Sequence, residues 1–280
     1  MTERMQLTDA GKFAFYAAHP SLDERQAFND KCERQEEGTA ILGCYDGQRI
    51  YLFDVADSRL DGMEEVTAAH EMLHAVYQRL SQSEKQRIDR LIEAAYETLK
   101  DDPRLAERMA FYARTEPGER DNELHSIIGT EVMEVSAELE AHYAQYFSNR
   151  KAVVELHNTY NRHFMELEQR AKSLSAQLEG LRKEREALID SYEMSLAQIN
   201  ADIAAFNKRA GEGGFTSTGQ FNSQRSVLTV RLAGIEALRN EITVMTTRFN
   251  DLVRQHNEAV VQSGELYQSI DSTVAPAPKV

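Results

Sequence analysis

The chain has 280 residues, of which 41% are apolar and 28% charged, enough for one or two domains with a hydrophobic core. Its net charge of −14 lies entirely in residues 1–147, where 30 acidic side chains outnumber 16 basic ones, and this excess argues against nucleic acid as a partner. No apolar run reaches the ~20 residues that a membrane-spanning helix needs, and no signal peptide is apparent. The absence of Trp and the presence of only five Pro predict a largely helical protein.

The first segment, residues 7–31, is expected to form one or two short helices that Pro20 interrupts. The two cysteines of the chain, Cys32 and Cys44, follow it. Two alternatives remain open for them. They form a disulfide, which would place the protein outside the cytoplasm, or they are two buried free thiols.

A β-hairpin is predicted next. Residues 39–45 and 49–55 are rich in β-branched and aromatic side chains, and Asp46-Gly47-Gln48 lies between them. Asp-Gly between two such runs is a strong hairpin signal. This hairpin either presents a strand edge to a ligand or covers the helical core, and the sequence leaves both alternatives open.

The motif with the clearest chemistry is H-E-x-x-H, formed by His70, Glu71 and His74. On a helix, residues i and i+4 lie on the same face, so the two imidazoles can bind one ion, and Glu71 can reach a water on that ion. Residues 67–76 carry no other charge, which predicts a buried helix over about 64–80. The pattern therefore indicates a Zn²⁺ site in which Glu71 is the general base. A pair of surface or core histidines is the alternative.

Further helices follow this motif. A capping box of Ser83 and Gln86 is expected to begin a helix that ends at Lys100, and another helix should start at Pro103 and end near residue 114. Residues 139–147 are expected to form a last amphipathic helix that closes the first domain.

A catalytic zinc usually takes a third protein ligand. The metzincin spacing, which requires Gly at position 77 and His at position 80, is absent. Glu123 is the favoured third ligand, with His125 and Glu131 as rivals, on a helix that Gly129 should end or bend. Glu123 and His125 are on nearly opposite faces of that helix, so both cannot bind the same ion.

The sequence Asn122-Glu123-x-x-Ser126 resembles the third-ligand helix of thermolysin-like gluzincins, in which the Glu binds zinc. Together, residues 47–75 and 122–131 resemble a family of uncharacterised bacterial metallopeptidase-like proteins, and this resemblance covers roughly residues 5–147. It implies a small gluzincin-like domain whose cleft is lined by the strand before the H-E-x-x-H helix. It also implies an N-terminal membrane tether, absent from this chain, and an extracytoplasmic location.

The chain departs from the gluzincin pattern at Ile127, where the family usually has an Asp that orients one zinc-binding His. Support for the ligands is therefore expected from Asp121 or Glu131. Tyr112, His125 and Tyr143 are candidates for donating a hydrogen bond to the oxyanion of a peptide-hydrolysis reaction. Tyr112 and His125 are preferred because they flank the loop before Glu123, although residues of these types are more often ordinary packed or surface residues.

From about residue 148 the sequence predicts a coiled coil. Apolar residues recur at alternating steps of three and four from Tyr160 to Phe206, and again from Leu228 to Leu266. Between them lies a Gly-rich segment, so an antiparallel coiled-coil hairpin is expected over 148–270, with its turn near 211–219 and a flexible tail over 271–280. Binding of a coiled-coil partner, self-association and a plain rigid stalk all remain open.

The sequence thus predicts a mainly α (α+β) protein, with a small zincin-like metallopeptidase domain over 1–147 followed by the coiled-coil hairpin. The expected activity is zinc-dependent hydrolysis of a peptide or protein substrate, with His70, His74 and Glu123 as ligands and Glu71 as the base. The alternative is a structural or catalytically inactive zinc-binding head on a coiled-coil scaffold.

Overall fold

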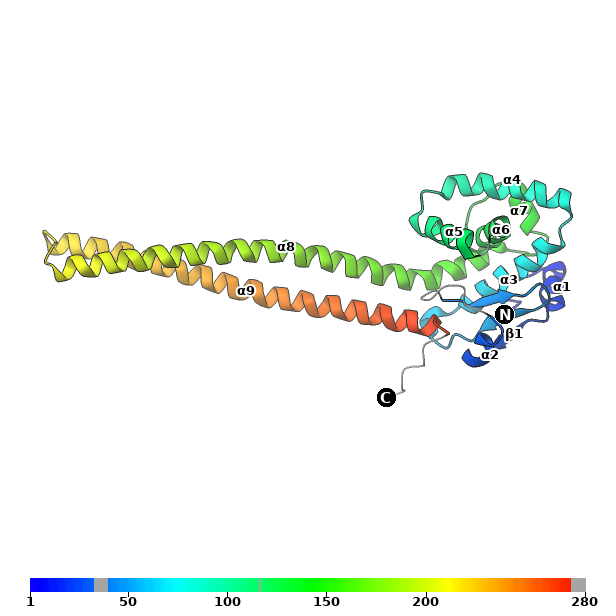
Figure 1. Cartoon of the computed structure of the whole chain (residues 1–280), viewed down its shortest axis with the longest axis horizontal. Helices are drawn as coiled ribbons and strands as arrows, with labels where there is room; N and C mark the ends of the chain where they lie inside the picture. Colours follow the sequence, from blue (N-terminus) through cyan, green and yellow to red (C-terminus); the bar gives the residue numbers. More distant parts are fainter. Residues whose placement is uncertain (33–39, 116, 273–280) are drawn as a thin grey trace. The chain divides into compact units, whose positions relative to one another are not determined.

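The computed structural model describes residues 1–32, 40–115 and 117–272, which fall into two compact units (Figure 1). Unit 1 comprises residues 1–166 and the chain from residue 263 onward, and unit 2 comprises residues 167–262. The described residues are mainly helical, as the composition predicted, and they contain one small sheet. None of their helices is long and apolar enough to cross a membrane.

Unit 1 extends past the domain boundary expected at residue 147. The first turns of α8 (Arg150–Gly211) and the last turns of α9 (Thr218–Ile270) belong to it. Val153 and Leu266 are fully buried, which shows that both helix ends contribute packing surface. Of the expected flexible tail, residues 273–280 lie outside the described part of the chain.

The sheet of unit 1 has three short strands, in the order β1-β3-β2. Among the described residues, β2 (Gly43–Tyr45) and β3 (Ile50–Phe53) form the predicted antiparallel hairpin with shorter strands than expected, and Thr39 is outside the described part. Asp46 accepts hydrogen bonds from the N–H groups of Gln48 and Arg49 at 2.8 and 2.7 Å, which fixes the turn. The remaining strand, β1 (Ser21–Asp23), pairs in parallel with β3. Along the chain it follows α1 (Asp9–Ala17) and precedes α2 (Arg25–Asn29).

Cys32 and Cys44 are joined in a disulfide, with their Cα atoms 5.9 Å apart. Of the two alternatives that the sequence left open, the structure has the disulfide. It lies in a small apolar cluster whose buried members are Phe28, Cys32 and Phe53, separate from the main core of the unit.

The main core is built around α3 (Met63–Arg79) and α6 (Arg120–Glu131), which pack directly against each other (Figure 1). On its other side α3 contacts β2 and β3. All residues of α6 from 122 to 130 are buried. Gly129 does not end or bend this helix as expected. It allows close packing, because a Cβ atom there would lie only 2.4 Å from Leu73 of α3.

The remaining helices of this region are α4 (Gln82–Leu99), α5 (Pro103–Thr115) and α7 (Ala137–Tyr143). The capping box of α4 is formed by Ser81 and Glu84 instead of Ser83 and Gln86, so the helix begins earlier than predicted. The helix expected over residues 139–147 is α7, which ends at Tyr143. Phe147 lies beyond it and forms an isolated bridge with Leu7.

Arg150, the first residue of α8, is 1% exposed. Its guanidinium donates hydrogen bonds to four carbonyl oxygens at and just beyond the end of α6, those of residues 128, 129, 132 and 133. It also donates to the carboxylate of Glu140 at 2.7 and 3.0 Å. A positive charge at a helix C-terminus is favourable, and these bonds satisfy carbonyl groups that a helix end leaves free.

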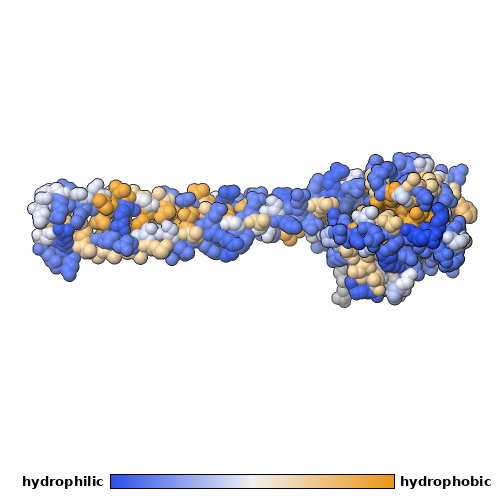
Figure 2. All heavy atoms as spheres, turned by 90° about the horizontal axis from the view of Figure 1, so that it is seen from above, coloured by the Kyte–Doolittle hydropathy of each residue, from blue (hydrophilic) through white to orange (hydrophobic). Residues whose placement is uncertain are grey.

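Unit 2 consists of α8 from residue 167, the turn, and α9 up to residue 262, and the two helices run antiparallel. Residues near the turn pair with each other, as do residues farther from it: Phe206 contacts Phe221, Asp202 binds Arg231, and Leu181 shares a cluster with Leu252. On the face seen in Figure 2, apolar side chains lie between hydrophilic ones along these paired helices. The turn lies between Gly211 and Thr218, in the predicted Gly-rich segment.

Candidate metal centre

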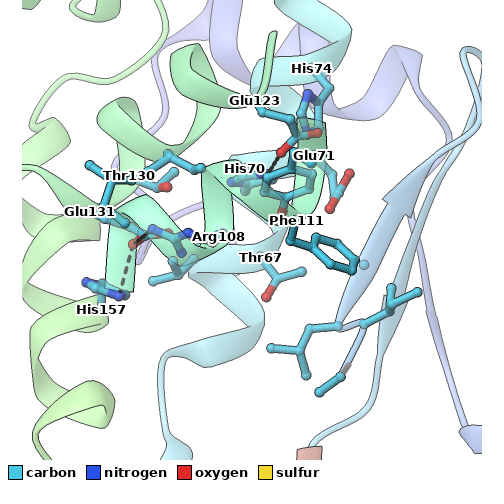
Figure 3. Close-up of a pocket in the computed structure, with 18 of the residues that line it drawn as sticks. Thr67, His70, Glu71, His74, Arg108, Phe111, Glu123, Thr130, Glu131 and His157 are labelled. Carbon is cyan, nitrogen blue, oxygen red and sulfur yellow. Dashed lines mark hydrogen bonds and ion pairs between the residues drawn. The ribbon is translucent and has the colours of Figure 1, made fainter. Parts of the chain in front are cut away.

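His70, Glu71 and His74 lie together on α3, as the spacing predicted (Figure 3). One ligand-type atom of each lies within 4.8 Å of those of the other two, so this group can hold a metal ion. The two imidazole rings are 4.7 Å apart between centroids. Glu71 and His74 are buried, and the His70 side chain is 16% exposed.

Glu123 reaches this group from α6. One of its carboxylate oxygens is 3.4 Å from Nε2 of His74, and the other is 3.6 Å from Nε2 of His70 (Figure 3). Its Oε2 is buried and has no hydrogen-bond partner among the described residues. Leaving a buried carboxylate oxygen unpaired is costly, and a cation between this oxygen and the two imidazole nitrogens would remove that cost. The residues therefore fit a metal ion.

The charges of the site are strongly coupled. Burial lowers the pKa of His70, but the interactions with Glu123 and Glu71 outweigh burial and raise this pKa above its ordinary value. For Glu123, burial would raise the pKa, yet the nearby imidazoles of His70 and His74 lower it. Burial raises the pKa of Glu71, and the charges of the imidazoles offset this only in part. Glu71 thus holds a proton more readily than an ordinary glutamate does.

The orientation of His74 is set by Asn122. Nδ1 of His74 lies 3.0 Å from Oδ1 of Asn122 and 3.3 Å from Oγ of Ser126. Because Oδ1 only accepts hydrogen bonds, Nδ1 carries a proton, and Nε2 is the ring atom that faces Glu123. The amide of Asn122 in turn donates to Glu119 at 3.0 Å.

Asp121 and Glu131 do not take the place of the missing Asp in the way that the sequence suggested. Asp121 pairs with Arg120 at the surface. Glu131 accepts two hydrogen bonds of 2.7 Å from Arg108 and lies 3.5 Å from Nε2 of His157, as Figure 3 shows. Burial would raise the pKa of Glu131, but Arg108 and His157 lower it. Glu131 therefore stays charged and contributes to the raised pKa of His70 without a direct contact to it.

Tyr112 of α5 lies in the site that the sequence assigned to it. It lines the same cavity as His70 and Glu123. Burial and the charge of Glu123 raise its pKa well above that of an ordinary tyrosine, so it remains a hydrogen-bond donor.

His125 and Tyr143 are placed elsewhere. His125 is fully buried, and its Nε2 is 2.8 Å from Nε2 of His142. Tyr143 donates a hydrogen bond of 2.7 Å to the carbonyl oxygen of His125. Neither His125 nor Tyr143 is among the described residues that line the cavity. His125 therefore lies as a packing residue away from the cavity, and the expected contact with substrate or oxyanion is not formed at this position.

The His125–His142 pair predicts that unit 1 loses stability in acid. Burial and the charge of Arg87 lower the pKa of His142 from 6.5 to about 4. Between these two values the unfolded chain binds a proton that the folded chain excludes, so the free energy of unfolding should fall by about 3 kcal/mol as the pH drops through this window. Urea unfolding from pH 7 to pH 4 measures this loss.

The His142→Gln variant is the informative comparison, because glutamine keeps a polar partner for His125 but does not titrate. Its unfolding free energy should depend less on pH than that of the wild type. The matched control is His19→Gln, at an exposed position. Equal pH dependence in His142→Gln and the wild type would contradict the prediction.

The metal centre opens onto a cavity of about 1530 Å³. The cavity is lined by residues of β2, α3, α5 and α6 and by the parts of α8 and α9 that belong to unit 1. Strand β2 forms one wall, and within the described sheet it is an edge strand. Gly43 of this strand packs against Thr67 and Glu71, since a Cβ atom there would lie 2.6 Å from Thr67 and 3.0 Å from Glu71.

Two residues of the site were not identified from the sequence. Asn122 was part of the N-E-x-x-S motif, and its role in orienting His74 could have been inferred from its place beside Glu123. Gly43 gave no signal, because only the packing of β2 on α3 shows why a side chain is excluded there.

The chain matches no protein-family model, no curated protein and no solved structure.

Proposed function

We propose that unit 1 is a zinc-dependent peptidase. The observation that carries this proposal is Glu123, which a separate helix brings to within 3.6 Å of both imidazoles while one of its oxygens stays unpaired. Two imidazoles and one carboxylate are a donor set that zinc prefers in catalytic sites, whereas magnesium and calcium prefer oxygen ligands alone. Such a domain is zincin-like, in agreement with the resemblance of its motifs.

The residues around the site support peptide hydrolysis. When bound, the ion would supply an acidic water and polarise the scissile carbonyl. Glu71, with its raised pKa, can take a proton from that water and pass it to the leaving amine. The edge of β2 offers backbone groups with which an extended peptide can pair beside Glu71.

A structural zinc site on a coiled-coil scaffold is the second candidate. The observation that favours it is that Glu71 itself lies within ligand distance of the histidines. If Glu71 and Glu123 both bound the ion, four protein ligands would close the site and no position would remain for water. The cavity beside the centre favours the peptidase instead.

The proposal is tested by removing and restoring the metal. The purified chain is treated with a chelator, assayed for hydrolysis of a mixture of unstructured peptides, and assayed again after addition of Zn²⁺. Activity should disappear and return at one zinc per chain. His74→Ala should bind zinc more weakly than His19→Ala, which removes an exposed imidazole. Hydrolysis that survives chelation, or a chain that binds no zinc, would reject the proposed function.

The disulfide also bears on location. Disulfides persist mainly in oxidising compartments, so the Cys32–Cys44 bond supports an extracytoplasmic protein, as the resemblance implies. In this proposal the substrate is a peptide or protein, and the coiled-coil hairpin serves docking or self-association.

A further inference from the structure

The disulfide lies in the wall of the metal cavity. Both Cys32 and Cys44 line this cavity, and Cys44 is the central residue of β2. Cys44 is half-buried, and Cys32 is 5% exposed. The bond therefore connects the strand beside Glu71 to the chain just after α2.

Among the described residues, strand β2 is held by pairing with β3, by contact with α3 and by the disulfide. It has only three residues, and its pairing partners in the described sheet are three residues of β3. The apolar cluster beneath it has Phe28, Cys32 and Phe53 as its buried members, and Cys32 is itself half of the disulfide. Short strands with one neighbour and little buried apolar surface open easily. The disulfide is thus the covalent constraint on β2, in addition to its contacts with β3 and α3.

The metal ligands are held differently. His70 and His74 are on α3 and Glu123 is on α6, and the residues between them pack in the main core of the unit. No cysteine belongs to that core. Opening the disulfide would therefore release β2 at Cys44, while the core packing that holds α3 and α6 contains neither cysteine.

We propose that the Cys32–Cys44 disulfide positions β2 as the substrate-binding wall of the site, so that its reduction weakens substrate binding while the metal stays bound. This inference rests on the proposed peptidase function. The reductant is a dithiol. One thiolate attacks Cys44, the Cys32–Cys44 bond breaks, and the second thiol closes the reductant's own disulfide. Two electrons and two protons pass to the protein, which leaves Cys32 and Cys44 as free thiols.

The test compares the oxidised chain, the dithiol-reduced chain after removal of the dithiol and alkylation, and the Cys32→Ala/Cys44→Ala double variant. We expect KM for a peptide substrate to rise roughly tenfold or more in the last two, with a smaller change in kcat. Zinc content should remain one per chain in all three. Amide exchange of residues 43–45 should become faster, and the double variant should not respond to the dithiol.

The matched control is Arg59→Ala, which breaks the Arg59–Asp57 ion pair of unit 1 outside the residues that line the cavity. It should leave KM unchanged even if it lowers stability. An unchanged KM after reduction, or loss of zinc together with the disulfide, would overturn the inference. If no form hydrolyses peptide, the proposed function fails. Unchanged amide exchange of residues 43–45 would then overturn the positioning role by itself.

Discussion

Glu71→Gln is expected to lower peptide hydrolysis by roughly 10²- to 10⁴-fold while zinc remains bound. Glutamine has nearly the shape of glutamate, so it can occupy the space beside Gly43, but it cannot take a proton. Burial raises the pKa of Glu71, so the wild-type carboxylate is a stronger base than that of an ordinary glutamate. The two measurements are the rate with a fluorogenic peptide and the zinc content of the purified variant.

The same variant separates the two candidate functions. If Glu71 is a ligand of a closed structural site, Glu71→Gln should release zinc instead of only losing activity. Glu65→Gln is the matched control, because Glu65 is also buried on α3 but contacts Arg4 and does not line the cavity. It should keep both zinc and activity. Full activity in Glu71→Gln would reject Glu71 as the base.

Arg150→Met is expected to destabilise unit 1 by about 3–5 kcal/mol. Methionine fills part of the volume but leaves the four carbonyl oxygens around the end of α6 without their donor. The carboxylate of Glu140 also loses its partner, although this side chain is 36% exposed and can bind water instead. Chemical denaturation followed by circular dichroism measures the loss.

Arg150→Lys provides the control for charge. Lysine keeps the positive charge at the helix end but cannot form all the hydrogen bonds of the guanidinium, so an intermediate loss is expected. Equal stability of Arg150→Met and the wild type would show that the end of α6 finds other partners. In that case Arg150 would not be the residue that secures the helix carrying Glu123.

The sequence predicted those parts of the site that depend on local spacing. His70, Glu71 and His74 share a helix face because residues four apart always do. The Asp-Gly turn predicted the β2–β3 hairpin for a similarly local reason. Strand β1 was missed, because Ser21, Leu22 and Asp23 show no pattern of their own and become a strand only by pairing with β3.

Features that depend on contacts between distant segments could not be derived in this way. Arg150 looks like any charged residue at the start of a helix, and only the folded chain places it against the end of α6. His125 was assigned to the site because it is close to Glu123 in sequence. The helix instead turns it toward His142. The disulfide could be named as one alternative, but choosing it required the distance between Cys32 and Cys44.

An ordinary surface helix tolerates substitution at about half of its positions, in a pattern that repeats every three or four residues. The burial of every residue from Asn122 to Thr130 removes this freedom from α6. In a scan of all single substitutions, this helix should therefore appear as one unbroken block of intolerant positions. Selection for the fold and selection for the activity would be indistinguishable within that block, and Glu123 would stand out only by its chemistry.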